Sequence, residues 1–169
     1  MLQATAEMLQ QARKDGYAVG AFNIYNMEGA LAVVRTAERL QSPVMLQLLP
    51  RALEIGGSPL ITFCRAAASN ARVPVAVHLD HCPDEKVTIP LVLHGTSGLP
   101  DKMIRESISH GVAKFNVNTE VRSRYMEAME EICRQPGTEL VNLMEGCIEA
   151  MQEPIEHKIL LFGSNGRIQ

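Results

Sequence analysis

Two short stretches of this sequence combine residue types that do chemistry. The first is Asp80–His81, a carboxylate beside an imidazole at the end of an apolar run. The second is His94–Gly98, in which a histidine is followed by glycines and hydroxyl side chains. Imidazoles at strand ends suit Zn²⁺, and a carboxylate beside them suits proton transfer. The alternative is that each histidine is only a hydrogen-bonded structural group, because the pair falls short of the ligand set of a catalytic zinc.

The loop 95–98 is also a candidate anion site. It offers unobstructed backbone N–H groups and hydroxyl donors, and Pro100 is placed to open a helix behind it. Phosphate is the anion that such a loop would bind. The alternative is a tight turn whose glycines only supply positive φ angles. A second anion candidate is Asn116–Glu120, which leads into a helix that Thr119 can cap.

The remaining candidate ligands are weaker. His78 shares strand alternation with Asp80, and a structural role is favoured for it. His110 precedes an expected strand, so we expect it at the opposite end of the sheet from the strand carboxyl ends. His157 lies among polar helical residues and is expected in solvent. Cys82 is a soft ligand by type, although an ordinary thiol is the simpler interpretation.

Alternating strands and helices must position these residues. The expected strands are 18–22, 44–48, 75–79, 89–94 and 112–115. Between them, apolar residues recur at helical spacing, with Asn26 and Ser58 placed as helix caps and Pro154 expected to restart the last helix. Strands that alternate with helices in this way predict βαβ units and a parallel α/β sheet.

One junction does not fit this pattern. Only residues 82–88 separate His81 from the strand that starts at Ile89. Neighbouring parallel strands need a crossover of about a dozen or more residues, usually a helix. Either these two strands are not parallel neighbours, or a segment is absent here.

Size and composition bound the class of protein. The 169 residues predict one domain, 1–169, and are short for a complete α/β barrel of about 250 residues. The net charge of -3 argues against nucleic acid as a partner, and the absence of an apolar run of about 18 residues argues against a membrane span. Scattered cysteines and an amino terminus without a signal-peptide pattern predict free thiols and a cytoplasmic protein.

Five blocks of the sequence resemble the class II ketose-bisphosphate aldolases. They are residues 16–29, 42–47, 75–81, 91–100 and 114–120, in the order of that family. The resemblance implies a TIM-type (β/α)8 barrel with zinc at its carboxyl-end mouth. It also implies reversible aldol cleavage of a ketose bisphosphate, such as fructose or tagatose 1,6-bisphosphate, to dihydroxyacetone phosphate and an aldehyde.

The same resemblance assigns roles to residues. Asp80 matches the catalytic acid/base, while His81 and His94 match zinc ligands. The residues that match the phosphate cradle are Gly95, Ser97, Asn116, Asn118 and Thr119.

The sequence also departs from the family. It passes from the third family strand directly to the seventh, so strands 4 to 6 and the third zinc histidine have no counterpart, and the gap falls at the junction 82–88. Arg51 replaces a glycine common in the family. We therefore expect an incomplete barrel of about five βα units, which must close differently, stay open, or pair between chains as a homo-oligomer.

These observations lead to three hypotheses about function. The first is a zinc-dependent class II aldolase. The second is a non-catalytic remnant that binds sugar phosphate or a full-length aldolase. The third is a phosphate-binding barrel enzyme that needs no metal, such as an isomerase, against which the pair His81 and His94 argues.

Overall fold

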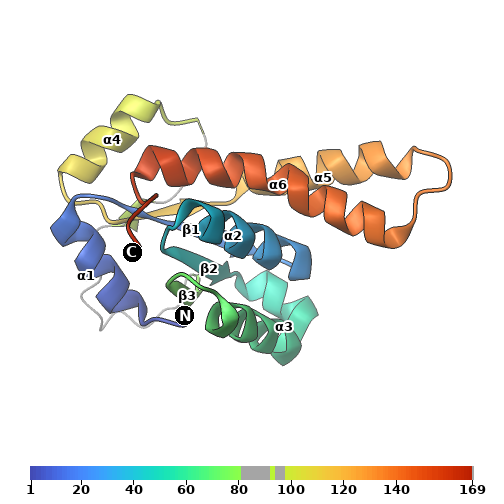
Figure 1. The fold of residues 1–169 in the computed structure, drawn as a ribbon, viewed down its shortest axis with the longest axis horizontal. Coiled ribbons are helices and arrows are strands. Elements are labelled where there is room, and N and C mark those ends of the chain that lie inside the picture. The colour runs from blue at the N-terminus through green and yellow to red at the C-terminus, as the bar shows by residue number, and fades with distance from the viewer. Residues whose placement is uncertain (81–91, 94–97, 169) are drawn as a thin grey trace.

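A computed structural model describes residues 1–80, 92–93 and 98–168, in which strands and helices alternate (Figure 1). The strands are β1 (Val19–Ile24), β2 (Val44–Leu48), β3 (Val75–Leu79), β4 (Val92–Leu93) and β5 (Lys114–Val117). The helices are α1 (Thr5–Asp15), α2 (Met27–Leu40), α3 (Pro50–Asn70), α4 (Asp101–Ser109), α5 (Thr119–Cys133) and α6 (Leu140–Phe162). No helix in these ranges has the length and apolarity that crossing a bilayer requires.

All five strands form one parallel sheet in the order β3-β2-β1-β5-β4. The first strand therefore lies beside the last one, as in a closed barrel, while β3 and β4 occupy opposite edges. The two strands that flank the predicted junction are not neighbours, which resolves the crossover problem. This arrangement confirms an α/β fold of the incomplete-barrel type.

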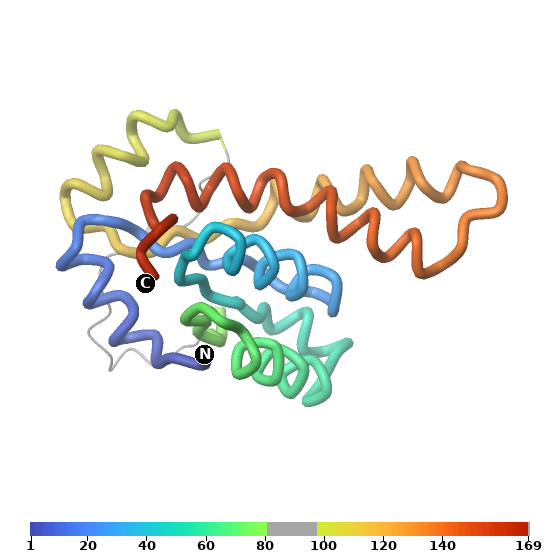
Figure 2. Tube along the Cα trace, viewed as in Figure 1, coloured from blue at the N-terminus to red at the C-terminus, as the bar shows by residue number. Residues whose placement is uncertain are grey.

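The outer face of the sheet is covered by helices, with α2 and α6 packed against one another (Figure 2). Phe22, Leu46 and Phe115 contribute to this core, and the ring of Phe115 stacks on that of Phe162 with centroids 4.9 Å apart. Helices α5 and α6 form an antiparallel hairpin that projects past the sheet (Figure 1).

The inner face is closed at the amino ends of the strands by α1. Met8, Leu9 and Ala12 of this helix pack in a separate buried cluster. The strand residues in that cluster are Val19, Ala21, Met45 and Ala76. Before α1, the backbone of Met1 and Gln3 bonds to Val75 at the edge of β3. The buried cluster that these strand residues form with Met8, Leu9 and Ala12 is the apolar floor of the interior.

Several local predictions are confirmed. The predicted ranges 44–48 and 75–79 agree with β2 and β3 at both ends. Asn26 caps α2, because its side chain accepts a hydrogen bond of 3.0 Å from the backbone N–H of Gly29. Gly16 ends α1 with a φ of 70°, a left-handed conformation that glycine adopts without strain.

Two local predictions about helices need correction. Pro154 does not restart a helix, since α6 continues through it. Met151 and Ile155 are both buried on either side of this proline, and their packing offsets the lost backbone hydrogen bond. The helix expected from Ser58 is only the second part of α3: a kink at Gly57, with φ 53° and ψ −153°, joins it to a first part that the sequence did not predict.

Candidate active site

The inner face of the sheet changes from apolar to polar toward the carboxyl ends of its strands. Alternate residues of a strand share a face, so Asn23 follows Ala21 inward, and Gln47 follows Met45. The strand register sets Asn23 beside Gln47, and Gln47 beside His78. A row of polar side chains thus crosses β1, β2 and β3 above the apolar floor.

Asp80 stands one step beyond this row, at the carboxyl end of β3. Its backbone N–H donates to the carbonyl of Leu48 at 2.8 Å, which continues the pairing of β3 with β2. The side-chain amide of Asn23 donates to Oδ2 of Asp80 at 3.2 Å. The residue is only 4% exposed. Its carboxylate is therefore held in a defined position at the predicted catalytic end of the sheet.

Lys114 places a buried amine in the same interior. It lies on β5, and burial lowers its pKa to about 8, an effect that the charge of Asp80 partly offsets. Burial also lowers the pKa of His78 to about 4, with a further contribution from the positive charge of Lys114. Two strands separate β5 from β3 in the sheet. Charges on β5 and β3 therefore influence one another across the inner face of the sheet.

The predicted residues after β5 lie at the same end of the sheet. Asn116 is 8% exposed and faces inward, in register with Ala21. Asn118, not Thr119, occupies the cap position of α5, so the predicted capping role of Thr119 is wrong. Thr119 is instead the first helical residue. The side chain of Asn118 makes no capping hydrogen bond and accepts one from the hydroxyl of Tyr25 at 2.9 Å.

Four predicted site residues, His81, His94, Gly95 and Ser97, lie outside the described residues, as do Cys82 and the junction 82–88. In the ranges that the structure does describe, no group of three or more His, Cys, Asp and Glu side chains is arranged to hold a metal ion. β3 and β4 nevertheless end at the same end of the sheet, since every strand pairing is parallel.

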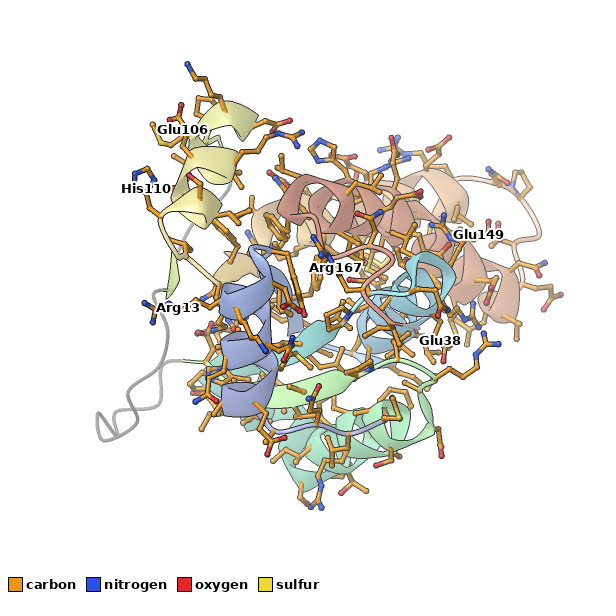
Figure 3. The ribbon with its side chains drawn as sticks, turned by 60° about the vertical axis from the view of Figure 1, so that its left-hand side comes forward. Arg13, Glu38, Glu106, His110, Glu149 and Arg167 are labelled. Atoms are coloured by element: carbon orange, nitrogen blue, oxygen red, sulfur yellow. The ribbon has the colours of Figure 1, made fainter. Side chains whose placement is uncertain are left out.

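Two other histidines are exposed on the helical layer. His110 ends α4 and projects from it (Figure 3), with its Nδ1 donating to the carbonyl of Glu106 at 2.7 Å. It precedes β5, so it lies toward the amino ends of the strands, as predicted. His157 is exposed, and its Nε2 lies 3.9 Å from a carboxylate oxygen of Asp101.

Three polar residues of the interior were not predicted from the sequence: Asn23, Gln47 and Lys114. Asn23 and Gln47 are each the one polar residue of a buried strand, and Lys114 begins a buried strand that also holds Asn116. Lysine and amide side chains are seldom fully buried without a partner, so their presence in such strands was the available signal. It identifies polar positions, but the strand register is needed to bring them together.

Comparison with known proteins supports this arrangement. The family model for class II fructose-bisphosphate aldolase matches residues 3–88 and 84–167. A fructose-bisphosphate aldolase of Thermus caldophilus is 40% identical over 133 residues, covering 78% of this chain and 41% of that protein. The chain thus spans less than half the length of that relative. A sulfofructosephosphate aldolase of Alkalicoccus urumqiensis is 22% identical over 275 residues, covering 95% of this chain and 96% of that protein.

Solved structures show the same fold. The YdjI aldolase from Escherichia coli K12 superposes with a TM-score of 0.90 at 22% identity, covering 100% of both chains. A putative fructose-1,6-bisphosphate aldolase from Coccidioides immitis gives a TM-score of 0.88 at 22% identity, with 96% of each chain covered. The two family-model matches meet at residues 84–88, where the sequence predicts a missing segment. Because those matches together span nearly the whole sequence, the chain belongs to the class II fructose-bisphosphate aldolase family.

Proposed function

We propose that this chain catalyses the zinc-dependent, reversible aldol cleavage of a ketose bisphosphate to dihydroxyacetone phosphate and an aldehyde. The position of Asp80 carries this proposal. Its carboxylate is buried at the carboxyl end of β3 and is held by the amide of Asn23 at 3.2 Å. Family membership and the printed names of the two aldolase relatives support the same chemistry.

In this proposal Asp80 exchanges a proton with the hydroxyl group next to the bond that breaks. Proton transfer by a positioned carboxylate contributes about 10²–10⁴-fold to a rate. Asn23 fixes one carboxylate oxygen, so that the group approaches the substrate in a single orientation. The phosphate group would be bound by Gly95, Ser97, Asn116, Asn118 and Thr119.

The proposed metal ligands are His81 and His94. They follow β3 and β4 in the sequence, and the carboxyl ends of these strands lie at one end of the sheet. His78 adds a ring nitrogen, Nδ1, that is buried and has no hydrogen-bond partner among the residues that the structure describes. Its lowered pKa, about 4, keeps the imidazole neutral, which is the protonation state that metal binding requires. The donor set therefore fits Zn²⁺, which supplies a Lewis acid for the ketone oxygen.

The experiment measures zinc content and fructose 1,6-bisphosphate cleavage on the purified chain. We expect bound zinc, turnover that a chelator removes, and a loss of about 10²–10⁴-fold in turnover in Asp80→Asn with its zinc content retained. Glu145→Gln, which changes an exposed carboxylate, is the matched control and should match the wild type. A chain without zinc and without turnover would contradict the enzyme proposal, and turnover that survives the chelator would indicate a metal-free enzyme.

The second candidate is a non-catalytic chain that binds sugar phosphate or a full-length aldolase. Its specific support is that the chain matches only 41% of the Thermus relative. This candidate predicts sugar-phosphate binding in calorimetry without turnover. Sedimentation of the chain alone, and mixed with a full-length class II aldolase, tests the predicted homo-oligomer and the partner.

A further inference from the structure

Lys158 is a buried charged residue of the outer helical layer. It lies near the end of α6 and is only 4% exposed. Ile155, three residues before it, and Phe162, four residues after it, share its side of the helix and are buried apolar residues. An ammonium group is costly to remove from water unless an anion pairs with it. A lysine at this position therefore needs a partner of opposite charge.

The partner of Lys158 is Glu120, in the first turn of α5. Its carboxylate oxygen Oε2 lies 2.9 Å from Nζ of Lys158, and its side chain is 33% exposed. The pair joins α6 to α5, and these two helices lie side by side (Figure 1). Glu120 directly follows Asn118 and Thr119, two residues of the proposed phosphate cradle. The ion pair is therefore located at the helix end where the phosphate group is proposed to bind.

The charge of Glu120 opposes phosphate binding at this helix end. The N-terminus of a helix attracts anions, because its first backbone N–H groups have no partner within the helix and its dipole is positive there. A carboxylate in the first turn already interacts with that dipole, and two negative charges at close range repel one another. An ammonium group beside the carboxylate makes the pair neutral. Lys158 thus removes a repulsion that Glu120 would otherwise exert on a phosphate group.

Helix α6 makes a similar contact behind the other proposed phosphate segment. The residue before Lys158 is His157, whose Nε2 lies 3.9 Å from a carboxylate oxygen of Asp101. Asp101 is the first residue of α4, and the predicted phosphate loop 95–98 precedes that helix in the sequence. Consecutive residues of α6 therefore face acidic side chains at the starts of both helices. The contact of Lys158 is the shorter and more buried of the two, so it should have the larger effect.

We propose that Lys158 is a positioning residue that neutralises Glu120, so that the N-terminus of α5 accepts the phosphate group of the substrate. It acts through Glu120 rather than by touching the substrate. This inference rests on the proposed function, which it extends from the residues that bind phosphate to the charge that lies behind them.

The test measures binding of inorganic phosphate to the full chain by calorimetry, together with KM and kcat for fructose 1,6-bisphosphate. Lys158→Met leaves the carboxylate of Glu120 charged. We expect phosphate affinity to fall about tenfold, the size of a moderate charge repulsion near a protein surface. KM should rise by a larger factor than kcat falls. The loss of affinity should shrink at high ionic strength, because salt screens the repulsion.

Glu120→Gln separates the charge from the structural role of the pair. It also breaks the ion pair, but it removes the negative charge and leaves the ammonium group of Lys158. We expect it to bind phosphate as tightly as the wild type or more tightly, even if it melts at a lower temperature. In the double variant, which carries Lys158→Met and Glu120→Gln, both charges are absent. Its phosphate affinity should return to within about threefold of the wild type.

Arg124→Met is the matched control. Nε of Arg124 lies 3.8 Å from a carboxylate oxygen of Glu153, so this pair also joins α5 to α6, about one turn farther from the N-terminus of α5. The substitution changes the net charge by the same amount as Lys158→Met. It should leave phosphate affinity unchanged. An equal loss in both variants would reduce the effect to net charge and overturn the inference.

The remaining outcomes also decide the matter. Unchanged phosphate affinity in Lys158→Met, or weakened affinity in Glu120→Gln, would make the pair structural only and overturn the inference, while cleavage by the wild type would leave the proposed function standing. If Lys158→Met does not fold, Glu120→Gln alone decides. A wild type that binds phosphate but cleaves no sugar would overturn the proposed function, and the role of Lys158 in phosphate binding would stand. A wild type that binds no phosphate would overturn the inference.

Discussion

The two ends of the inner face are built differently. At the amino ends of the strands, Val19, Ala21, Met45 and Ala76 pack against α1 in a buried apolar cluster. At the carboxyl ends, polar side chains face the same interior. There the amide of Gln47 and one ring nitrogen of His78 have no hydrogen-bond partner within residues 1–80, 92–93 and 98–168. The amino end thus serves packing, whereas the carboxyl end retains hydrogen-bonding capacity for a ligand. We expect changes in the apolar cluster to alter stability at every pH, and changes to the polar residues to alter binding and the pH dependence of stability.

The largest effect on stability should come from a substitution that leaves a cavity in the apolar floor. Leu9→Ala removes a side chain that is 0% exposed between α1 and the sheet. We expect the free energy of unfolding to fall by about 3–5 kcal/mol, as for other buried leucines. Denaturant titration measures it, with Leu140→Ala, at an exposed leucine of α6, as the control. A loss as small as that of the control would mean that the floor is not packed as described.

A second effect on stability concerns the buried amine of Lys114, the first residue of β5. Burial lowers the pKa of Lys114 from 10.5 to about 8. Between these values the unfolded chain holds a proton that the folded chain has released, so stability should rise with pH across this window by roughly 2–3 kcal/mol. Lys114→Met should flatten the rise, measured as unfolding free energy against pH. Lys102→Met, at an exposed amine, should retain it.

Protonation of His78 should affect the stability of the fold in the acidic pH range. The pKa of His78 falls from 6.5 to about 4, mainly through burial. The unfolded chain therefore takes up a proton first as the pH falls, and stability should decline between pH 6.5 and 4 by roughly 1–2 kcal/mol, allowing for partial exposure. His78→Phe should remove this part of the decline in a chelator-containing buffer. His110→Phe, at an exposed ring, should preserve it, and equal slopes in both variants would contradict the burial of His78.

The smallest effect on stability should follow a substitution that keeps the apolar floor packed. Met45→Leu keeps an apolar side chain of similar volume at a position that is 0% exposed. We expect a loss below about 1.5 kcal/mol in denaturant titration. A larger loss would show that the apolar end depends on one particular side-chain shape, and would sharpen the contrast with the polar end.

Much of the fold could be predicted from local patterns. The limits of β2 and β3 follow from short apolar runs between turn residues, and the cap of α2 follows from Asn26 before an amphipathic stripe. The start of β5 was harder to predict: the predicted strand 112–115 begins two residues before Lys114. Gly111, with a φ of 92°, turns the chain there, and the strand starts only after Ala113.

The candidate site could be predicted only in part. Asp80 was identifiable from its neighbours in the sequence, and its structure agrees with the predicted strand end. Gln47 was not, because β2 is buried on both faces and its sequence shows no alternation that marks an inner side. Its position between Asn23 and His78 becomes known only from the register of the strands. Long-range pairing of this kind has no local sequence signal.

The neighbouring positions of β1 and β5 affect how the chain folds during synthesis. β1 pairs with a strand that emerges from the ribosome nearly a hundred residues later. Until then, one side of β1 has no partner strand. Pairing β1 with β5 also costs the entropy of closing a very long loop. Folding should therefore be completed late, and translation stalled before Lys114 should leave a nascent chain that proteases cleave readily.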